Sequence, residues 1–367
     1  MDHRDTTSSS HRSTAMRSGL FVVGISCALP VFGQTVTGSM DVRWSDGASD
    51  CQKNPQPPLQ VHHYNPQTFI LRESLCATYE GPFLYVLVGS RRALLIDTGA
   101  VGDARKIPLL QTVRALLPQS DFPLSVVHTH GHLDHRSGDA QFSGDVHTEI
   151  VGTTLEDVKR HFQFSNWPND SAQIELGDRI VDVLPTPGHY PSELSYYDRQ
   201  TGLFFSGDFL LPGRLLIADK SADLASAKRV AQFVENRPVT YVLGGHIELD
   251  QAGNTFLGTH YHPDERPLQL SKDQLLRLPL IVASFNGFYG HHDEYVLENQ
   301  NRVLGAAAAV LVALIVAVAF GIRALLRRRR RHTRPTYADS GDLEPGTSSP
   351  AACCAAPPTE PWRAETL

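Results

Sequence analysis

The sequence predicts a domain of the α+β class, in which β-sheets are covered by helices. Short apolar runs of strand length are bounded by Gly or Pro, and helical segments lie between several of these runs. This alternation is typical of sheets that bury a face under helices. The chain of 367 residues is 41% hydrophobic and 20% charged, as a globular protein is, so disorder cannot dominate it.

The elements are predicted in chain order from these patterns. Residues 34–66 are rich in Pro, Gly, Asp and Asn, and we expect irregular structure there. Helices are predicted over residues 104–117, 154–162 and 222–235, the first of them stopping at Pro118. The predicted strands are residues 69–71, 83–88, 92–96, 124–127, 146–150, 180–184, 195–197, 202–205 and 240–243.

The N-terminal residues 1–33 are typical of a secretory signal peptide. A basic stretch precedes the apolar residues 20–29, and small residues follow, with cleavage expected after Gly33. Met16 is a plausible true start, because the residues before it add nothing to this pattern. An uncleaved membrane anchor is the alternative interpretation.

A second apolar segment, residues 303–322, is predicted to cross a membrane. It contains no charged residue, and twenty residues of helix span roughly 30 Å. The arginines that follow, at 323 and 327–331, place residues 323–367 in the cytoplasm by the positive-inside rule. Residues 34–302 then form a domain outside the cytoplasm, and the tail beyond the arginines is predicted to be disordered.

Charge and cysteine content restrict the partners and the compartment. The net charge is −6, and residues 323–334 carry seven arginines and no acid, so the rest of the chain sums to −13. Nucleic acid is therefore not an expected partner. Five cysteines are too few for a disulfide scaffold, but Cys51 and Cys76 would face an oxidising compartment and can form a bond there.

Potential metal ligands follow four of the predicted strands directly. Imidazole and carboxylate groups suit zinc and similar divalent ions. Because ligands offered from one edge of a sheet can converge, these positions predict a common site. The residues after the four strands are His128, His189, Asp208 and His246.

The first of these positions opens a dense cluster over residues 128–135. Residues two apart in extended backbone point the same way, so His128 and His130 can grip one ion. Asp134 and His135, at an expected helix start, can face a second ion. His132 lies between the two pairs, and we expect no ligand role for it.

The cluster resembles the His-x-His-x-Asp-His signature of the metallo-β-lactamase superfamily. The later motifs Pro187-Gly-His189, Ser206-Gly-Asp208 and Gly245-His246 are similar to that family's downstream ligand motifs, and Asp97-Thr-Gly99 is similar to its early motif. The resemblance covers roughly residues 69–250. It implies an αβ/βα four-layer sandwich with two divalent metal ions, most often Zn²⁺, with Mn²⁺ or iron as alternatives.

The resemblance also implies a role for each candidate residue. His128, His130 and His189 would hold the first metal; Asp134, His135 and His246 would hold the second, and Asp208 would bridge the two. Asp134 would also act in catalysis by holding the nucleophile. Asp97 would not bind a metal ion directly and would instead orient the residues that do.

The expected function is a membrane-anchored hydrolase that acts on a small ester, thioester, lactone or phosphoester. True β-lactamases of this family carry Cys or Ser where Asp208 stands, which disfavours that activity. An iron-dependent oxidoreductase and a non-enzymatic binding or signalling protein are the alternatives. Residues 248–295 fit no subgroup motif; they either cap the site or form a structural extension, and the sequence does not indicate protein partners.

Overall fold

The structure, a computed structural model, describes residues 7, 35–256, 258–292 and 294–332. Apart from residue 7, the predicted signal peptide lies outside the described residues, as does the tail after residue 332. The chain divides into two units, Met1–Ala306 and Ala307–Leu367.

Two six-stranded sheets form the centre of the first unit. Each mixes parallel and antiparallel pairs, with β4–β5 and β10–β12 parallel. The first sheet runs in the order β1 (Leu59–Asn65), β2 (Thr68–Glu73), β3 (Phe83–Val88), β4 (Ala93–Ile96), β5 (Leu124–Val127) and β6 (Thr148–Ile150). The second runs in the order β13 (Gln269–Leu270), β12 (Tyr241–Gly244), β10 (Leu203–Gly207), β9 (Leu194–Asp198), β8 (Ile180–Pro185) and β7 (Ala172–Glu175). A third, small sheet joins β11 (Arg214–Leu216), β15 (Val296–Glu298) and β14 (Tyr289–His291).

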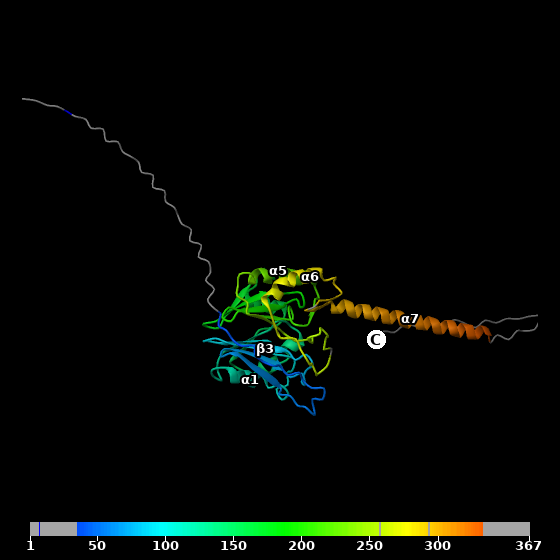
Figure 1. Ribbon diagram of the computed structural model, residues 1–367, viewed down its shortest axis with the longest axis horizontal. Coiled ribbons are helices and arrows are strands. Elements are labelled where there is room, and N and C mark those ends of the chain that lie inside the picture. The colour runs from blue at the N-terminus through cyan, green and yellow to red at the C-terminus, as the bar shows by residue number, and fades with distance from the viewer. Residues whose placement is uncertain (1–6, 8–34, 257, 293, 333–367) are drawn as a thin grey trace, which may run out of the picture. The chain divides into compact units, whose positions relative to one another are not determined.

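Helices cover the outer faces of the two large sheets. Figure 1 shows α5 and α6 on one side and α1 on the other, with the sheets between them. This order of layers is the αβ/βα sandwich that the sequence predicted. The helices of the first unit are α1 (Leu109–Leu116), α2 (Leu133–Arg136), α3 (Asp139–Phe142), α4 (Leu155–Phe162), α5 (Lys220–Val234) and α6 (Lys272–Ser284).

Three apolar clusters follow from this layering. Strand β3 is buried along its whole length because its alternate side chains enter two different cores. Tyr85 packs between the sheets with Phe205 of β10, whereas Leu84 packs under α1 with Val113. The third cluster lies between the second sheet and α5 and α6. An uninterrupted apolar run is therefore the expected sequence of such a strand.

Two predictions differ most from the structure. Residues 34–66 were expected to be irregular, yet β1 pairs antiparallel with β2 at the edge of the first sheet. Its side chains are mostly half-buried and include His62 and His63, so backbone pairing defines this strand and no apolar run marks it. Helix α1 starts at Leu109, five residues later than expected, directly after Pro108.

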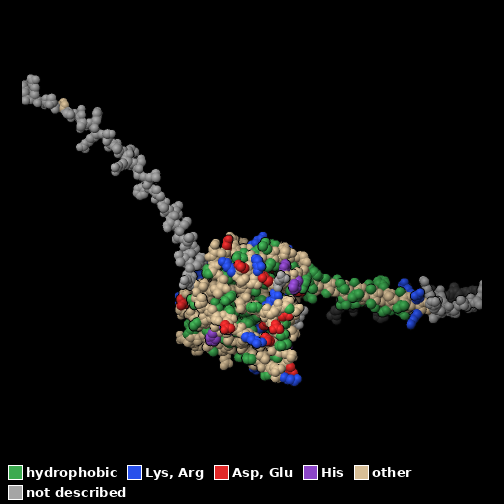
Figure 2. Space-filling model, viewed as in Figure 1, with side chains coloured by type: hydrophobic (Ala, Val, Ile, Leu, Met, Phe, Trp, Pro, Cys, Tyr) green, Lys and Arg blue, Asp and Glu red, His purple; other side chains and the backbone are tan. Residues whose placement is uncertain are grey.

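The predicted membrane segment lies within one long helix, α7 (Gln300–His332). Among the described residues it is the one helix whose length and composition suffice to cross a membrane. Figure 2 shows apolar side chains along most of α7, followed by the basic side chains towards its C-terminal end.

A disulfide bond joins Cys51 to Cys76, as the sequence allowed. The bond ties the N-terminal segment to the loop after β2. Its reduction is expected to lower the free energy of unfolding by about 3 kcal/mol, because it closes a loop across 25 residues and so restricts the unfolded chain. Urea unfolding of the full chain in detergent, with and without reductant, measures this difference.

The Cys51→Ser/Cys76→Ser variant serves as the control, since its unfolding should not respond to the reductant. An unfolding midpoint of the unsubstituted chain that stays constant on reduction would contradict the prediction.

Candidate metal centre

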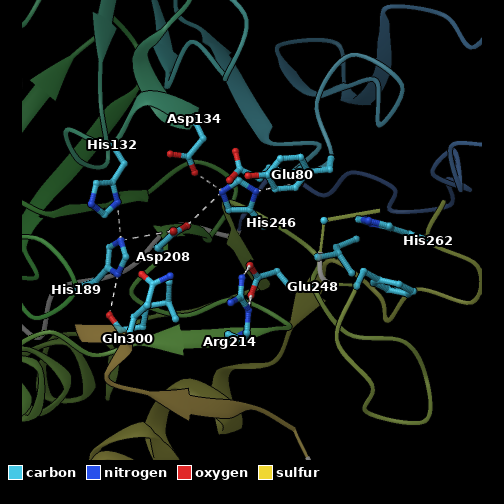
Figure 3. A pocket seen from close by; sticks show the side chains of 15 residues that line it. Glu80, His132, Asp134, His189, Asp208, Arg214, His246, Glu248, His262 and Gln300 are labelled. Carbon is cyan, nitrogen blue, oxygen red and sulfur yellow. Dashed lines mark hydrogen bonds and ion pairs between the residues drawn. The ribbon is translucent and has the colours of Figure 1, made fainter. Parts of the chain in front are cut away.

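Six of the seven candidate ligands lie together at one edge of the sandwich, and His128 is the exception. Strand β5 ends at Val127 and leads into residues 128–135, while β8, β10 and β12 of the other sheet lead to His189, Asp208 and His246. Strands of both sheets end here, so side chains far apart in sequence meet. Figure 3 shows Asp134, His189, Asp208 and His246 facing one another, with His132 beside them.

A first group consists of His130, His132 and His189. The Nδ1 atom of His132 lies 2.9 Å from Nε2 of His130 and 3.0 Å from Nε2 of His189. Leu216 accepts a hydrogen bond from Nδ1 of His189 at 2.8 Å, which leaves Nε2 of this ring as the free lone pair. Burial and neighbouring histidines hold the pKa of His130 well below its ordinary value, so this ring is neutral. Three nitrogen atoms thus face one point, which is a donor set for a metal ion.

A second group consists of Asp134, His135, Asp208 and His246. Oδ2 of Asp134 lies 3.2 Å from Nε2 of His135 and 3.1 Å from Nε2 of His246. The far side of the His246 ring contacts the carbonyl oxygen of Glu80 at 3.1 Å. This contact orients the ring and directs its Nε2 atom to the group.

Charge within the second group favours a cation. Burial lowers the pKa of His135 and His246, but the carboxylates of Asp208 and Asp134 outweigh it, raising the pKa of His135 well above its ordinary value and that of His246 to about 9. Burial likewise raises the pKa of Asp208, and the charges of His135 and His246 outweigh it, so that this pKa falls below its ordinary range. The two carboxylates thus favour the protonated forms of His135 and His246. A divalent ion carries the same charge as these two protons and can replace them.

Asp208 lies between the two groups. Its Oδ1 atom is 3.4 Å from Nε2 of His135, and its Oδ2 atom is 3.7 Å from Nε2 of His189. Oδ1 is buried and faces the Nε2 atoms of His135 and His246 at 3.4 and 3.7 Å without making a hydrogen bond. A buried carboxylate oxygen that makes no hydrogen bond is costly, and a bound cation would satisfy it. The residues present therefore fit a pair of metal ions.

The sequence assignment of His128 is not supported, and His132 stands in its place. Nε2 of His128 contacts Oδ1 of Asp139 at 2.8 Å, and its Nδ1 contacts the carbonyl oxygen of Val151 at 3.2 Å. Both ring nitrogens are thus engaged away from the two groups. The signal was available in the sequence, because residues 130–135 match the His-x-His-x-Asp-His spacing residue by residue, whereas a start at His128 does not.

Asp97 lies behind His135, as expected for a residue that orients a ligand. Its Oδ2 atom is 2.9 Å from Nδ1 of His135, and the carboxylate also accepts hydrogen bonds from the backbone N–H and the hydroxyl of Thr129 at 2.7 and 2.8 Å. The contact directs Nε2 of His135 towards the second group.

A match to a known family agrees with this geometry. The family model described as "Metallo-beta-lactamase superfamily" matches residues 79–246, which include all the residues of both groups. Over this region the chain is similar to the metallo-β-lactamase superfamily. Its mixed sheets and helical outer layers are the α+β fold of that superfamily.

Curated relatives of the superfamily are hydrolases. An "Acyl-coenzyme A thioesterase MBLAC2" of Gallus gallus is 27% identical over 202 residues, which cover 45% of this chain and 72% of the relative. A "Hydroxyacylglutathione hydrolase" of Aeromonas hydrophila is 29% identical over 153 residues, which cover 41% of this chain and 56% of the relative. Both relatives are hydrolases by name, and together with the family match they support a hydrolase as the enzyme class of this chain.

Among solved structures, a metallo-β-lactamase from Pontibacter korlensis is 18% identical with a TM-score of 0.45. It covers 62% of this chain and 100% of its own length.

The candidate metal centre opens into a cavity of about 410 Å³. Part of its lining lies beyond the superfamily match, so the residues after 246 that fitted no motif do take part in the site. Sequence reasoning missed several lining residues because they carry no ligand spacing. Lining residues that sequence reasoning did not assign are Tyr79, Glu80, Arg214, Leu216, Ile247, Glu248, Phe256, Gly258, His262 and Gln300.

Two substitutions distinguish the two possible ligand sets. His132→Gln is expected to bind one zinc ion fewer per chain, because it removes one of three nitrogen donors. His128→Gln is expected to keep its zinc and lose about 1 kcal/mol of stability, since the contact to Asp139 is weakened. Zinc content after loading and urea unfolding of the two full-length variants measure both effects. Zinc lost from His128→Gln and kept by His132→Gln would reverse the assignment.

Proposed function

We propose that this chain is a dinuclear metal-dependent thioesterase. The observation that carries the proposal is the position of Asp208, whose two oxygens face different ligand groups while one of them, Oδ1, is buried without a hydrogen bond. The names of the curated relatives, an acyl-coenzyme A thioesterase and a hydroxyacylglutathione hydrolase, favour a thioester among the substrate classes that the sequence left open.

The ligand set follows from the two groups. His130, His132 and His189 would hold one ion, and Asp134, His135 and His246 would hold the other. Asp208 would contact both. A donor set of this many imidazole and carboxylate groups suits zinc, and Mn²⁺ and iron are the alternatives.

The bound ions would lower the pKa of a shared water towards neutrality and polarise the thioester carbonyl. The protein would contribute position and charge. Asp134 lines the cavity and is about one-fifth exposed, so its carboxylate can accept a hydrogen bond from an attacking water and orient it. His132 is exposed and lines the same cavity.

The overall reaction breaks the carbon–sulfur bond of the thioester and forms a carbon–oxygen bond from water. The products are a carboxylic acid and a thiol, which takes up a proton from the water. This reaction needs no covalent Ser or Cys nucleophile.

We also propose that the domain lies outside the cytoplasm and is anchored by α7. The Cys51–Cys76 disulfide supports an oxidising compartment, and the length and apolar composition of α7 support a membrane span. The arginines after the span favour a cytoplasmic C-terminus. Residues 1–33 would serve as the signal peptide.

Hydrolysis of thioesters tests the proposed function. The zinc-loaded full chain in detergent is expected to release thiol from an acyl thioester, which a thiol-reactive dye measures, and to leave a β-lactam intact. Asp208→Ala is expected to lower kcat/KM by more than about 100-fold. Loss of a residue that only orients the metal ligands costs at most about 100-fold, so a larger loss indicates that Asp208 is itself a ligand.

Far-ultraviolet circular dichroism of Asp208→Ala is the control for folding. Thiol release by the folded Asp208→Ala variant at the rate of the unsubstituted chain would contradict the role of Asp208. No thiol release by the zinc-loaded unsubstituted chain would contradict the thioesterase proposal itself.

A further inference from the structure

The first residue of α7 lines the cavity of the candidate metal centre. Gln300 is in the cavity wall together with His189, Asp208 and Arg214, and Figure 3 shows its side chain among theirs. Gln300 belongs to the same compact unit as the sandwich. The wall of the site and the start of the apolar helix are therefore consecutive in the chain.

The distance along the chain from Gln300 to the apolar run is short. The apolar run begins at Val303, and three helical residues cover about 4.5 Å. The polar headgroup layer on each side of the hydrocarbon core is roughly 5–8 Å thick. If residues 303–322 span the core, Gln300 and the cavity wall that it forms lie at headgroup depth.

Exposed aromatic side chains lie beside the start of α7. Phe288 and Tyr289 are 43% and 46% exposed. The carbonyl oxygen of Phe288 accepts a hydrogen bond from the backbone N–H of Asn299 at 3.0 Å, and Arg302 donates to the carbonyl oxygen of Gly287 at 3.1 Å. Tyr is enriched at the membrane–water interface because its ring is apolar and its hydroxyl is polar, and Phe288 adds apolar surface beside Tyr289. This position suits contact with a bilayer surface.

The cavity itself offers apolar surface as well as charge. Leu216, Ile247 and Phe256 line it. The ring of Phe256 stacks on His262 with ring centroids 4.3 Å apart. The three apolar side chains form a wall that offers contact to part of an acyl chain, while the rest of the lining is mostly polar or charged and suits a polar thiol group.

A buried ion pair holds that wall in place. Arg72 of β2 makes two hydrogen bonds to Glu265, at 2.6 and 2.7 Å, and both side chains are buried. Oε1 of Glu265 lies 3.0 Å from Nδ1 of His262. The segment that carries Phe256 and His262 is thus fixed to the first sheet, so the apolar wall is a built part of the domain.

We propose that the site takes long-chain acyl thioesters from the bilayer surface to which α7 anchors the domain. This inference rests on the proposed thioesterase function and specifies its substrate. Phe288 and Tyr289 would contact lipid and hold the cavity at the depth of the thioester group, while the acyl chain reaches the apolar wall without crossing water.

Kinetics of the full chain in phosphatidylcholine vesicles test the substrate. Two thioesters of the same small thiol are compared, one acetyl and one palmitoyl, the second dissolved in the bilayer. We expect kcat/KM to be at least about tenfold higher for the palmitoyl thioester. A tenfold ratio corresponds to about 1.4 kcal/mol, and the burial of two methylene groups already contributes more than that. Equal values for the two thioesters would overturn the inference and leave the thioesterase function standing. Failure to hydrolyse either would overturn both.

The matched variant is Phe288→Ser/Tyr289→Ser. It is expected to lower kcat/KM for the palmitoyl thioester about tenfold, by weakening lipid contact, with the rate on the acetyl thioester unchanged. Val146→Ser removes another exposed apolar side chain, on the loop before β6, and is expected to change neither rate. An unchanged palmitoyl rate in the double variant, or an equal loss in Val146→Ser, would overturn the proposed membrane contact.

Discussion

The ligand arrangement depends on the carboxylate of Asp97. This residue follows β4 in the left-handed region, with a φ of 64°. Its oxygens bond to the backbone N–H and hydroxyl of Thr129, and one of them also contacts His135. One buried carboxylate therefore fixes both the backbone that leaves β5 and the ring orientation of a candidate ligand six residues later. The neighbouring Thr98 donates its backbone N–H to the carbonyl oxygen of His135, which attaches α2 to the same turn.

The second sheet is positioned on this same point. The backbone N–H of Leu194 donates to the carbonyl oxygen of Thr129 at 2.8 Å, and Gly207, next to Asp208, approaches Thr129 so closely that an added Cβ would lie 2.6 Å from it. Gly207 has a φ of 54°, which a glycine adopts without strain. Thr129 thus contacts both the loop that Asp97 fixes and the end of the strand that precedes Asp208. The ligands of the two sheets are therefore positioned through the same residue.

Much of this organisation could be predicted from the sequence, because buried strands need apolar runs and ligands at strand ends are local signals. The exact ligand set could not be predicted by alternation alone. His128, His130 and His132 occupy alternate positions, but the chain leaves the strand at His128, whose ring turns to Asp139 instead. The residues of the cavity wall could not be predicted either, since Arg214 and Gln300 enter it through long-range packing that no local sequence pattern encodes. Strand β1 was missed because its identity comes from pairing with β2.

The central claim is that the two side-chain groups joined by Asp208 hold two metal ions. The zinc content of the purified full chain, measured by elemental analysis after zinc loading and removal of free zinc, tests it most directly. The proposed function predicts two zinc ions per chain, one for each group that could hold a metal ion. One ion per chain, or none, would contradict it.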